Sequence, residues 1–159
     1  MISSEMIAKL RAVTGAGVMI CKQALEEAGG DFEEAQKILA SNAESIAQKK
    51  AERKAEQGLI ESYVHDGKIG VLVELNCESD FVARNAEFKD FAHEIAMQIA
   101  SMNPQDVAEL MTEPYIRDET KIIKNLMDEK IAKIGEKIQI KRFVRVELGE
   151  SEGCCFKES

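Results

Sequence analysis

The spacing of apolar residues changes at Gly58, and this change constrains the fold of the chain more than its composition does. Before Gly58, apolar side chains recur every three to four residues, as on one face of a helix. After it, Ile60 and Val64 alternate with polar neighbours, and the alternation is strict from Ile69 to Leu75, as in a strand with one buried face. Between these runs, Asp66-Gly67 is a strong signal for a hairpin turn. The sequence therefore predicts a helical N-terminal part followed by a part with a sheet.

Residues 1–42 are predicted to form a small domain of three helices. The Gly15-Ala16-Gly17 segment separates the first helix from the second, Gly29-Gly30 ends the second, and Asp31 begins the third in the manner of a capping box. The apolar faces expected to pack together are Met6, Leu10 and Val13, then Val18, Cys21, Leu25 and Ala28, and finally Phe32, Ala35, Ile38 and Leu39. A core this small predicts marginal stability for the unit alone.

Residues 43–57 are rich in helix formers and poor in large apolar side chains. This composition predicts a solvated, partly helical linker. Its basic residues are mixed with glutamates, which favours a solvated face over a phosphate-binding one.

Residues 58–148 are predicted to form an α+β core domain, with a small, mainly antiparallel sheet covered by helices. After the hairpin, the expected elements are a helix from about Asn85 to Met102, a short helix after Pro104, a helix from about Asp118 to Ile134, and a strand from Lys137 to Leu148. One face of that strand is expected to carry Ile138, Ile140, Val144, Val146 and Leu148, interrupted by Arg142. Residues 149–159 are expected to be a frayed tail.

The composition disfavours several classes of function. The 159 residues include 29 acids and 21 bases, a net charge of −8, and no Trp. An acidic chain with few aromatic residues is unlike a general nucleic-acid binder, which needs phosphate contacts and base stacking. No apolar run approaches the roughly 20 residues of a membrane span, and the N-terminus has no signal-peptide core. We therefore expect a cytoplasmic protein without direct contact to nucleic acid or membrane.

The sequence contains no recognisable catalytic or metal-binding constellation. It has no Walker loop and no nucleophile with a histidine at motif spacing, and His65 and His93 stand alone. The cysteines at 21, 77, 154 and 155 lack metal-ligand spacing, so free thiols in a reducing compartment are expected. We expect a protein that is not an enzyme and that has no catalytic residue, metal or cofactor of its own.

Two segments have the character of binding sites. Asp80 and Phe81 follow a strand and precede a helix, and the residues leave two interpretations equally open. Either Asp80 caps the helix and Phe81 enters the core, or the pair forms a protruding tip that enters a partner. In the second segment, Val18, Met19 and Ile20 are consecutive, and one helix face cannot bury all three.

These segments resemble the translation elongation factor Ts family. Residues 10–25 are similar to its N-terminal signature, residues 76–83 to its second signature, and residues 134–138 to a third segment, in family order. The resemblance implies a guanine-nucleotide exchange factor for elongation factor Tu. Such a factor promotes GDP release by perturbing the partner's nucleotide-magnesium site during translation elongation.

The resemblance also assigns residues to this activity. The N-terminal helices, similar to a ubiquitin-associated domain, would contact the partner through Arg11, Val18 and Met19. The loop of Ser79, Asp80, Phe81 and Val82 would enter beside the partner's magnesium ion, and Ile134 and Gly135 would support another contact. The family usually has Thr at the position of Ser79, which preserves the hydroxyl.

Longer family members carry two related core subdomains, whereas this chain has the length for one. The resemblance therefore allows a homodimer, and the sheet edge around Val144 and Val146 is a candidate surface for it. Two alternatives of other classes stay open on the sequence alone. One is an adaptor of the ubiquitin-associated type that recognises a different partner, and the other is an enzyme for a small ligand.

Overall fold

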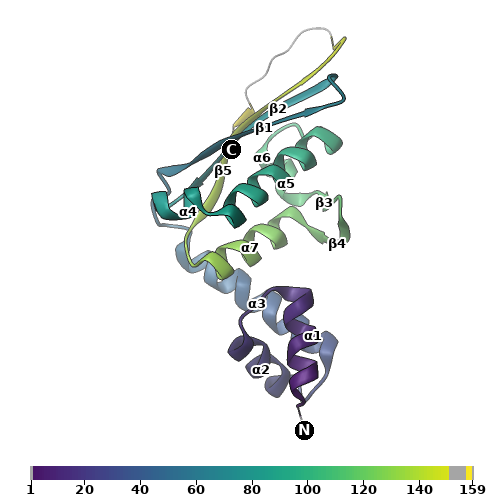
Figure 1. The fold of residues 1–159 in the computed structure, drawn as a ribbon, viewed down its shortest axis with the longest axis vertical. Coiled ribbons are helices and arrows are strands. Elements are labelled where there is room, and N and C mark those ends of the chain that lie inside the picture. The colour runs from purple at the N-terminus through teal and green to yellow at the C-terminus, as the bar shows by residue number, and fades with distance from the viewer. Residues whose placement is uncertain (1, 151–156, 159) are drawn as a thin grey trace. The chain divides into compact units, whose positions relative to one another are not determined.

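The computed structural model describes residues 2–150 and 157–158 and confirms the α+β class (Figure 1). The described residues form two compact units. One contains the chain up to Ala51 together with Asp128–Gly135, and the other contains Glu52–Met127 together with the chain from Glu136 onward. The domain boundaries expected from the sequence stay a prediction, and most of the expected tail lies outside the described residues.

The first unit is built on the helices α1 (Ser4–Thr14), α2 (Val18–Glu27) and α3 (Phe32–Lys50). Each predicted break is present. Gly15 ends α1 with a left-handed φ of 69°, and the Asp31 carboxylate accepts a hydrogen bond of 2.9 Å from the Glu34 N–H at the start of α3. The fully or nearly fully buried core consists of Leu10, Cys21, Ala24, Leu25, Ala35 and Leu39.

One expectation for this part of the chain is wrong, because Val13, expected on a packed apolar face, is 53% exposed. Val18, expected on an apolar helix face and also in a partner contact, is 48% exposed. The segment expected to be a partly helical linker begins inside α3, which runs without a break to Lys50, and Ala43 and Ala47 on it are buried. Alanines provide a closely packed helix face without large side chains, which is why the apolar pattern understated the length of this helix.

The second unit contains the main sheet, whose described strands are antiparallel in the order β1-β2-β5-β6. Their bounds are Gln57–His65 for β1, Ile69–Cys77 for β2, Ile138–Glu147 for β5 and Lys157–Glu158 for β6. The predicted hairpin joins β1 to β2. Asp66 and Gly67 both have positive φ, 51° and 64°, and the Lys68 N–H donates to the His65 carbonyl at 2.9 Å.

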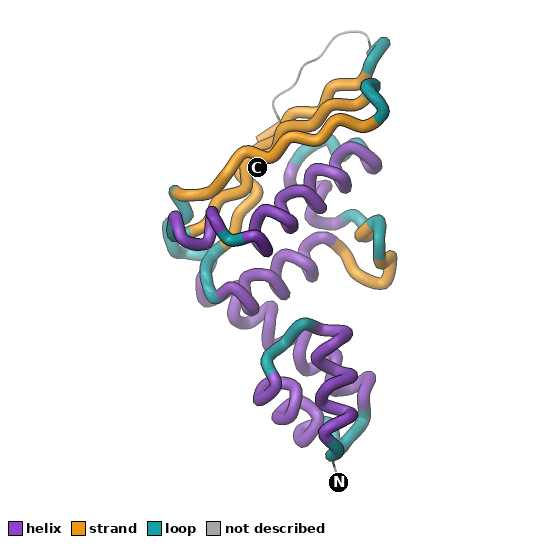
Figure 2. The backbone as a smooth tube through the Cα atoms, in the orientation of Figure 1, coloured by secondary structure: helices purple, strands orange, loops and turns teal. Residues whose placement is uncertain are grey.

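Helix α5 (Ala86–Met102) packs along one face of β1 and β2, as Figure 2 shows. The spacing of apolar residues in the sequence predicts that one side of this helix carries Phe88, Phe91 or Ala92, Ile95, Ile99 and Met102. Met102 is 43% exposed, and all the others are fully buried. They pack over the inward residues of β2, which are Val71, Val73, Leu75 and Cys77. The opposite face of the sheet is not covered in this way, because Leu72 on β2 is 52% exposed.

Gly58 is required where β1 passes close to β2. Its φ is 146°, which side chains disfavour, and a Cβ there would collide with the carbonyl oxygen of Leu75. The residue that marks the change of pattern in the sequence is thus also a point of close backbone approach.

The predicted single face of β5 is wrong because the strand contains a bulge. Leu75 pairs with Ile140 and the preceding Glu74 pairs with Arg142, so Lys141 is an extra residue in β5. The inward positions therefore change parity. Ile138 and Ile140 point inward before the bulge, and Phe143 and Arg145 after it. Val146 and Leu148 are consequently exposed, at 52% and 76%, instead of sharing the buried face.

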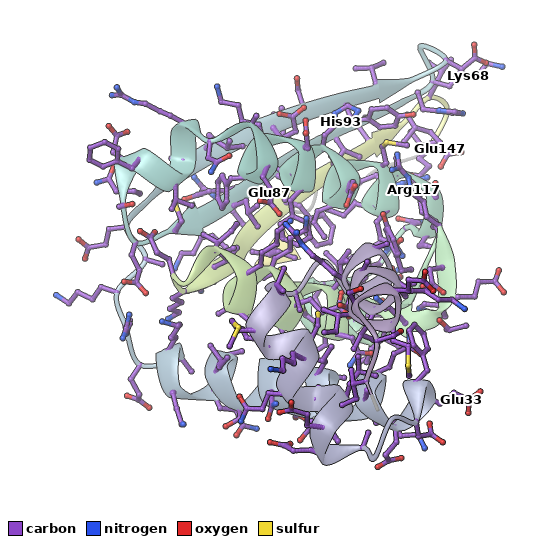
Figure 3. All side chains as sticks on the ribbon, turned by 60° about the horizontal axis from the view of Figure 1, so that its bottom comes forward. Glu33, Lys68, Glu87, His93, Arg117 and Glu147 are labelled. Carbon is purple, nitrogen blue, oxygen red and sulfur yellow. The ribbon has the colours of Figure 1, made fainter. Side chains whose placement is uncertain are left out.

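The bulge places a charged residue in the interior, and Arg145 is stabilised there by the end of α5. Its Nε and Nη2 donate to the Ala100 carbonyl at 3.2 and 3.1 Å, and Nη2 lies 2.9 Å from Oε2 of Glu147, which is labelled in Figure 3. A cation at a helix C-terminus is favourable because the last carbonyls carry partial negative charge.

The region between α5 and β5 departs from the prediction at residues 118–122. A short helix, α6 (Val107–Thr112), follows Pro104 as predicted, but Asp118–Ile122 is the strand β4, paired with β3 (Pro114–Tyr115). Helix α7 begins only at Ile123 and runs to Ile134. The segment that pairs with β4 is bound by the buried Gln98 of α5, whose amide donates to the Pro114 carbonyl at 3.0 Å and accepts from the Ile116 N–H at 2.9 Å. These contacts from α5 favour extended backbone in β3.

Candidate partner-binding site

The segment after β2 forms a short exposed helix, α4 (Asp80–Arg84), at one end of the sheet (Figure 1). Ser79 is its N-cap, with its hydroxyl oxygen accepting from the Val82 N–H at 3.4 Å. Phe81 is 91% exposed, which excludes the interpretation that it enters the core, and Asp80 is exposed beside it. The cap is Ser79 rather than Asp80. Asp80 and Phe81 therefore form a protruding tip, called the tip below.

The two residues that precede the tip, Glu78 and Ser79, are joined to the segment before β5 by hydrogen bonds in both directions. The Ser79 hydroxyl donates to Oε1 of Glu136 at 2.6 Å, and the Ser79 N–H donates to Oε2 of the same carboxylate at 3.0 Å. In the other direction, the Lys137 N–H donates to Oε1 of Glu78 at 2.7 Å. Each segment thus supplies one carboxylate to the backbone of the other. Sequence reasoning named the neighbouring residues but missed Glu136, whose only sequence signal is its place in the third resemblance segment.

Cys77 supports the tip from within the core. It is fully buried, and its thiol donates to the Ser79 carbonyl at 3.2 Å. Burial, with a smaller contribution from the negative charge of Glu136, raises the pKa of the Cys77 thiol from 9.0 to about 11. The thiol is therefore neutral at physiological pH and acts as a hydrogen-bond donor. Nucleophilic attack and metal binding both require the thiolate, so Cys77 is a structural residue.

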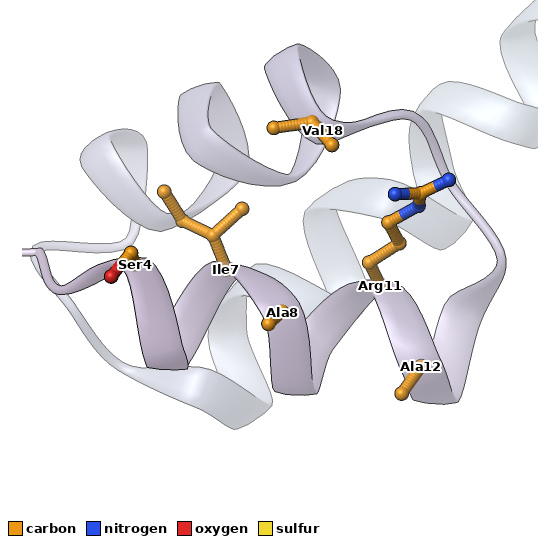
Figure 4. Close-up of a pocket in the computed structure, with 6 residues that line it drawn as sticks. All are labelled: Ser4, Ile7, Ala8, Arg11, Ala12 and Val18. Carbon is orange, nitrogen blue, oxygen red and sulfur yellow. The ribbon is translucent and has the colours of Figure 1, made fainter.

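The N-terminal candidates share a surface of the first unit. A groove of about 440 Å³ lies between α1 and α2. Its lining residues, drawn in Figure 4, are Ser4, Ile7, Ala8, Arg11, Ala12 and Val18. Next to Val18 on α2, Met19 is 72% exposed and Ile20 is 50% exposed. All three consecutive apolar residues are thus exposed. The structure places Arg11, Val18 and Met19 on the same two helices, where a partner could cover them together.

Ile134 and Gly135 lie at the end of α7, within the first unit. Ile134 is half-buried, whereas Gly135 is exposed with a φ of 84°. The Gly135 carbonyl accepts a hydrogen bond of 2.8 Å from Nζ of Lys50, so α3 fixes this turn. The turn leads directly into Glu136.

The described residues contain no group of three or more potential metal ligands among His, Cys, Asp and Glu. His65 and His93, expected to stand alone, both lie beside Tyr63. His65 Nδ1 is 2.9 Å from the Tyr63 hydroxyl, and the His93 ring meets the Tyr63 ring edge-on at 5.5 Å. His93, labelled in Figure 3, also lies 3.0 Å from Glu61. Among residues 2–150 and 157–158, no helix combines the length and apolar character needed to cross a bilayer.

Comparison with known proteins decides the family. The family model described as "Elongation factor TS" matches residues 78–155. The chain is 42% identical over 195 positions to Elongation factor Ts of Thermodesulfovibrio yellowstonii, covering 95% of this chain and 98% of the relative. It is 43% identical to that of Coprothermobacter proteolyticus, with 94% and 99% covered, and 44% identical to that of Carboxydothermus hydrogenoformans, with 94% and 90% covered.

The chain belongs to the elongation factor Ts family. The resemblance that the sequence motifs indicated is thereby confirmed, and membership gives the chain a role in translation elongation. The alignment to the elongation factor Ts of Thermodesulfovibrio yellowstonii spans 195 positions, which exceeds the 159 residues of this chain by 36. That relative therefore has residues at 36 or more positions where this chain has none, so this chain is a short form of elongation factor Ts.

Proposed function

We propose that the chain is a guanine-nucleotide exchange factor for elongation factor Tu and that the tip causes GDP release. The observation that carries this proposal is the 91% exposure of Phe81 on a short helix that begins directly after a strand. A large apolar side chain presented this fully to water is a candidate anchor for a partner pocket. The negative Asp80 beside it suits a site where magnesium and phosphate are held in the partner.

This activity needs no nucleophile, base, metal or cofactor in the exchange factor. The factor must bind the nucleotide-free partner more tightly than the GDP-bound one. By linkage, the factor weakens the binding of GDP to the partner as much as GDP weakens the binding of the factor to the partner. A ten-thousandfold acceleration of release corresponds to lowering the barrier by about 5.5 kcal/mol. Burial of Phe81 and disturbance of the partner's magnesium shell by Asp80 and Phe81 are the proposed sources, with Ser79 and Val82 holding the tip.

The surface of Arg11, Val18 and Met19 is proposed to hold the partner, independently of the tip. Its exposed apolar residues and the adjoining groove form a contact surface in the first unit. Ile134 and Gly135 are proposed to provide a further contact. In this division of roles, the helical unit supplies affinity for both the GDP-bound and nucleotide-free partner, and the tip supplies release. We place this action in the cytoplasm, without direct contact to nucleic acid or membrane.

A homodimer is proposed for the same chain, because it is shorter than a relative that it matches and because one face of its sheet is partly exposed among the described residues. The sheet edge around Val144 and Val146, expected from the sequence, is not the end of the sheet, since β6 pairs with β5. The face that carries these valines is therefore proposed in its place. The pairing of β1, β2 and β5 puts Val64, Leu72, Val144 and Val146 on the face opposite α5, and Val64, Leu72 and Val146 are 67%, 52% and 52% exposed. These four residues are called the open face below. A second copy of this chain would cover the open face with an identical one, as a twofold dimer requires.

Release of a fluorescent GDP analogue from elongation factor Tu, followed by stopped flow, tests the exchange proposal. The wild-type chain should accelerate release. Because truncating a binding hot spot costs at least about 2 kcal/mol, Phe81→Ala should slow release by roughly thirtyfold or more. Met102→Ala, which truncates an exposed apolar residue at the end of α5, is the matched control and should behave like the wild type. Unchanged release by folded Phe81→Ala protein, with folding checked by circular dichroism, would contradict the proposed role of the tip.

A further inference from the structure

Ser79 is held through every one of its polar groups. Its N–H and hydroxyl both donate to the carboxylate of Glu136, its hydroxyl oxygen accepts from Val82, and its carbonyl accepts from the Cys77 thiol. The distance of 2.6 Å between the Ser79 hydroxyl and Glu136 is that of a charge-assisted hydrogen bond, and the 3.0 Å to the Ser79 N–H is that of an ordinary one. No other residue of the tip segment, 79–82, has both its backbone and its side chain bonded to one side chain among the described contacts.

Helix α4 is short and needs support from its surroundings. It has five residues, and isolated helices below about 12 residues are marginal in water. Its buried Ala83 packs the helix against β1, β2 and α5, but Phe81 contributes almost no packing, since it is 91% exposed. The direction of the tip therefore depends on the cap at Ser79 as well as on the packing of Ala83. The proton that the Ser79 hydroxyl donates to Glu136 leaves a lone pair of its oxygen for the Val82 N–H.

The carboxylate that orients Ser79 is itself fixed. Glu136 is followed by Lys137, whose N–H is bound by Glu78, and Glu78 lies 3.5 Å from Nη1 of Arg53. Since Glu78 directly precedes Ser79, the two segments are joined in both directions. A movement of Glu136 would therefore change the direction of the tip.

We propose that Glu136 is a positioning residue of the exchange reaction, which sets the angle at which Asp80 and Phe81 enter the partner by holding Ser79 at two points. The activity part of this inference rests on the proposed exchange function. Glutamine reproduces only part of this arrangement. Its amide oxygen can accept from the Ser79 N–H while its NH₂ group donates to the Ser79 hydroxyl oxygen, but the Ser79 hydroxyl proton then loses its carboxylate acceptor and the negative charge is gone.

Glu136→Gln is therefore the test, and Glu119→Gln is its matched control. The second variant makes the same chemical change at an exposed position of β4, outside the contacts of Ser79. In the exchange assay at increasing factor concentration, Glu136→Gln should lower the maximal release rate by about tenfold, from the loss of a charged hydrogen bond, with little change in half-saturation. Glu119→Gln should stay near the wild type.

Serine variants test the same contact from its other end. Ser79→Ala removes the hydroxyl and should lower the maximal rate as Glu136→Gln does. Ser79→Thr keeps the hydroxyl and should restore the wild-type rate. If Glu136→Gln does not fold, this pair decides the inference, because equal rates for the alanine and threonine variants would overturn it.

A readout without the partner separates this inference from the proposed function. The chain has no Trp, so Phe81→Trp places a single indole reporter on the tip. Its time-resolved fluorescence anisotropy should show greater local motion when Glu136→Gln is added, and no change when Glu119→Gln is added. Identical anisotropy in all three proteins would overturn the positioning role. Failure of the wild-type chain to release GDP would instead contradict the exchange function, and the anisotropy result would still decide the role of Glu136.

Discussion

The Asp80 carboxylate lies with Oδ2 2.7 Å from Nη2 of Arg84, one turn further along α4. Both side chains are largely exposed, and an exposed pair at this spacing contributes only about 0.3–0.5 kcal/mol. The carboxylate can therefore leave Arg84 for a cation in a binding partner at small cost. The ion pair directs the Asp80 carboxylate along the helix in the free protein and is weak enough to be replaced by a contact with the partner.

This relationship leads to a prediction for Arg84→Gln. If the carboxylate of Asp80 acts in GDP release, removing Arg84 should leave release within about threefold of the wild type, because the pair itself is weak. Asp80→Asn should lower release much further in the same stopped-flow assay. Equal losses in the two variants would show that the ion pair, and not the carboxylate, is what release requires.

Met19→Asp should weaken binding to elongation factor Tu without unfolding the helical unit. Met19 is 72% exposed, so an aspartate there remains in water in the free protein but becomes buried in a contact. Binding measured by isothermal titration should weaken by tenfold or more, that is by at least about 1.4 kcal/mol, while the thermal midpoint changes little. Ala40→Asp adds the same charge at an exposed position of α3 and serves as the control. A lower midpoint with unchanged affinity would show that Met19 is structural.

Gly58→Ala should destabilise the second unit, whereas Gly70→Ala should not. At Gly58 a Cβ meets the backbone of β2 and φ is 146°, so the free energy of unfolding should fall by about 1–3 kcal/mol. At Gly70, on β2, no atom lies within 4 Å of an added Cβ, and alanine there should be neutral or slightly stabilising. Urea unfolding of both variants checks this difference. Equal stabilities would mean that β1 can move away from Leu75 without cost.

Cys77 should contribute to alkaline unfolding. Its folded-state pKa of about 11 lies above the ordinary value of 9.0, so the folded protein retains this proton to higher pH than the unfolded chain. The associated stability is fully present below about pH 9 and is lost as pH rises toward 11. Urea unfolding of the wild type should therefore lose more stability over this range than Cys77→Ala, in which lysines and tyrosines still titrate. Parallel curves for the two proteins would contradict the burial of a neutral thiol.

Lysines on the open face should prevent self-association. We expect sedimentation velocity at micromolar concentration to show dimers of the wild type and monomers of the Leu72→Lys, Val146→Lys double variant. The reason is that a dimer of this variant would bury the positive charges of the two copies against each other without compensation. Met102→Lys places the same charge outside this face and should remain dimeric. A wild-type monomer that still releases GDP at full rate would contradict the homodimer and leave the exchange proposal unaffected.

The parts of the fold that were predicted correctly are those whose signals are local. The hairpin at Asp66-Gly67 and the buried face of α5 follow from turn residues and periodicity that a short window contains. Residues 118–122 were predicted as helix because their composition does not exclude one. They form a strand by pairing with Pro114–Tyr115, and that segment is in turn bound by Gln98 of α5, so the signal lies outside the local window.

The candidate site divides in the same way. The tip segment was singled out from its residues, but only the fold shows that Phe81 is exposed and that Ser79, not Asp80, is the cap. Glu136 had no local signal because its partner, Ser79, lies 57 residues earlier in the chain. A carboxylate such as that of Glu136 carries no functional signal in the sequence, because its role depends on the contact with Ser79 that only the fold creates.

The extra residue at Lys141 has a consequence for how β5 tolerates changes of length. Both sides of the strand after it are partly apolar, with Phe143 facing inward and Val144 and Val146 facing outward. Deleting Lys141 would restore unbroken alternation from Ile138, turning the two valines toward α5 and expelling Phe143 and Arg145. A substitution in this strand changes one side chain, whereas the deletion of one residue would exchange the inward-facing and outward-facing positions of all residues after it. The fold should therefore tolerate substitutions in β5 better than a change in its length, and a scan of single-codon deletions should show a sharp loss of folded protein there.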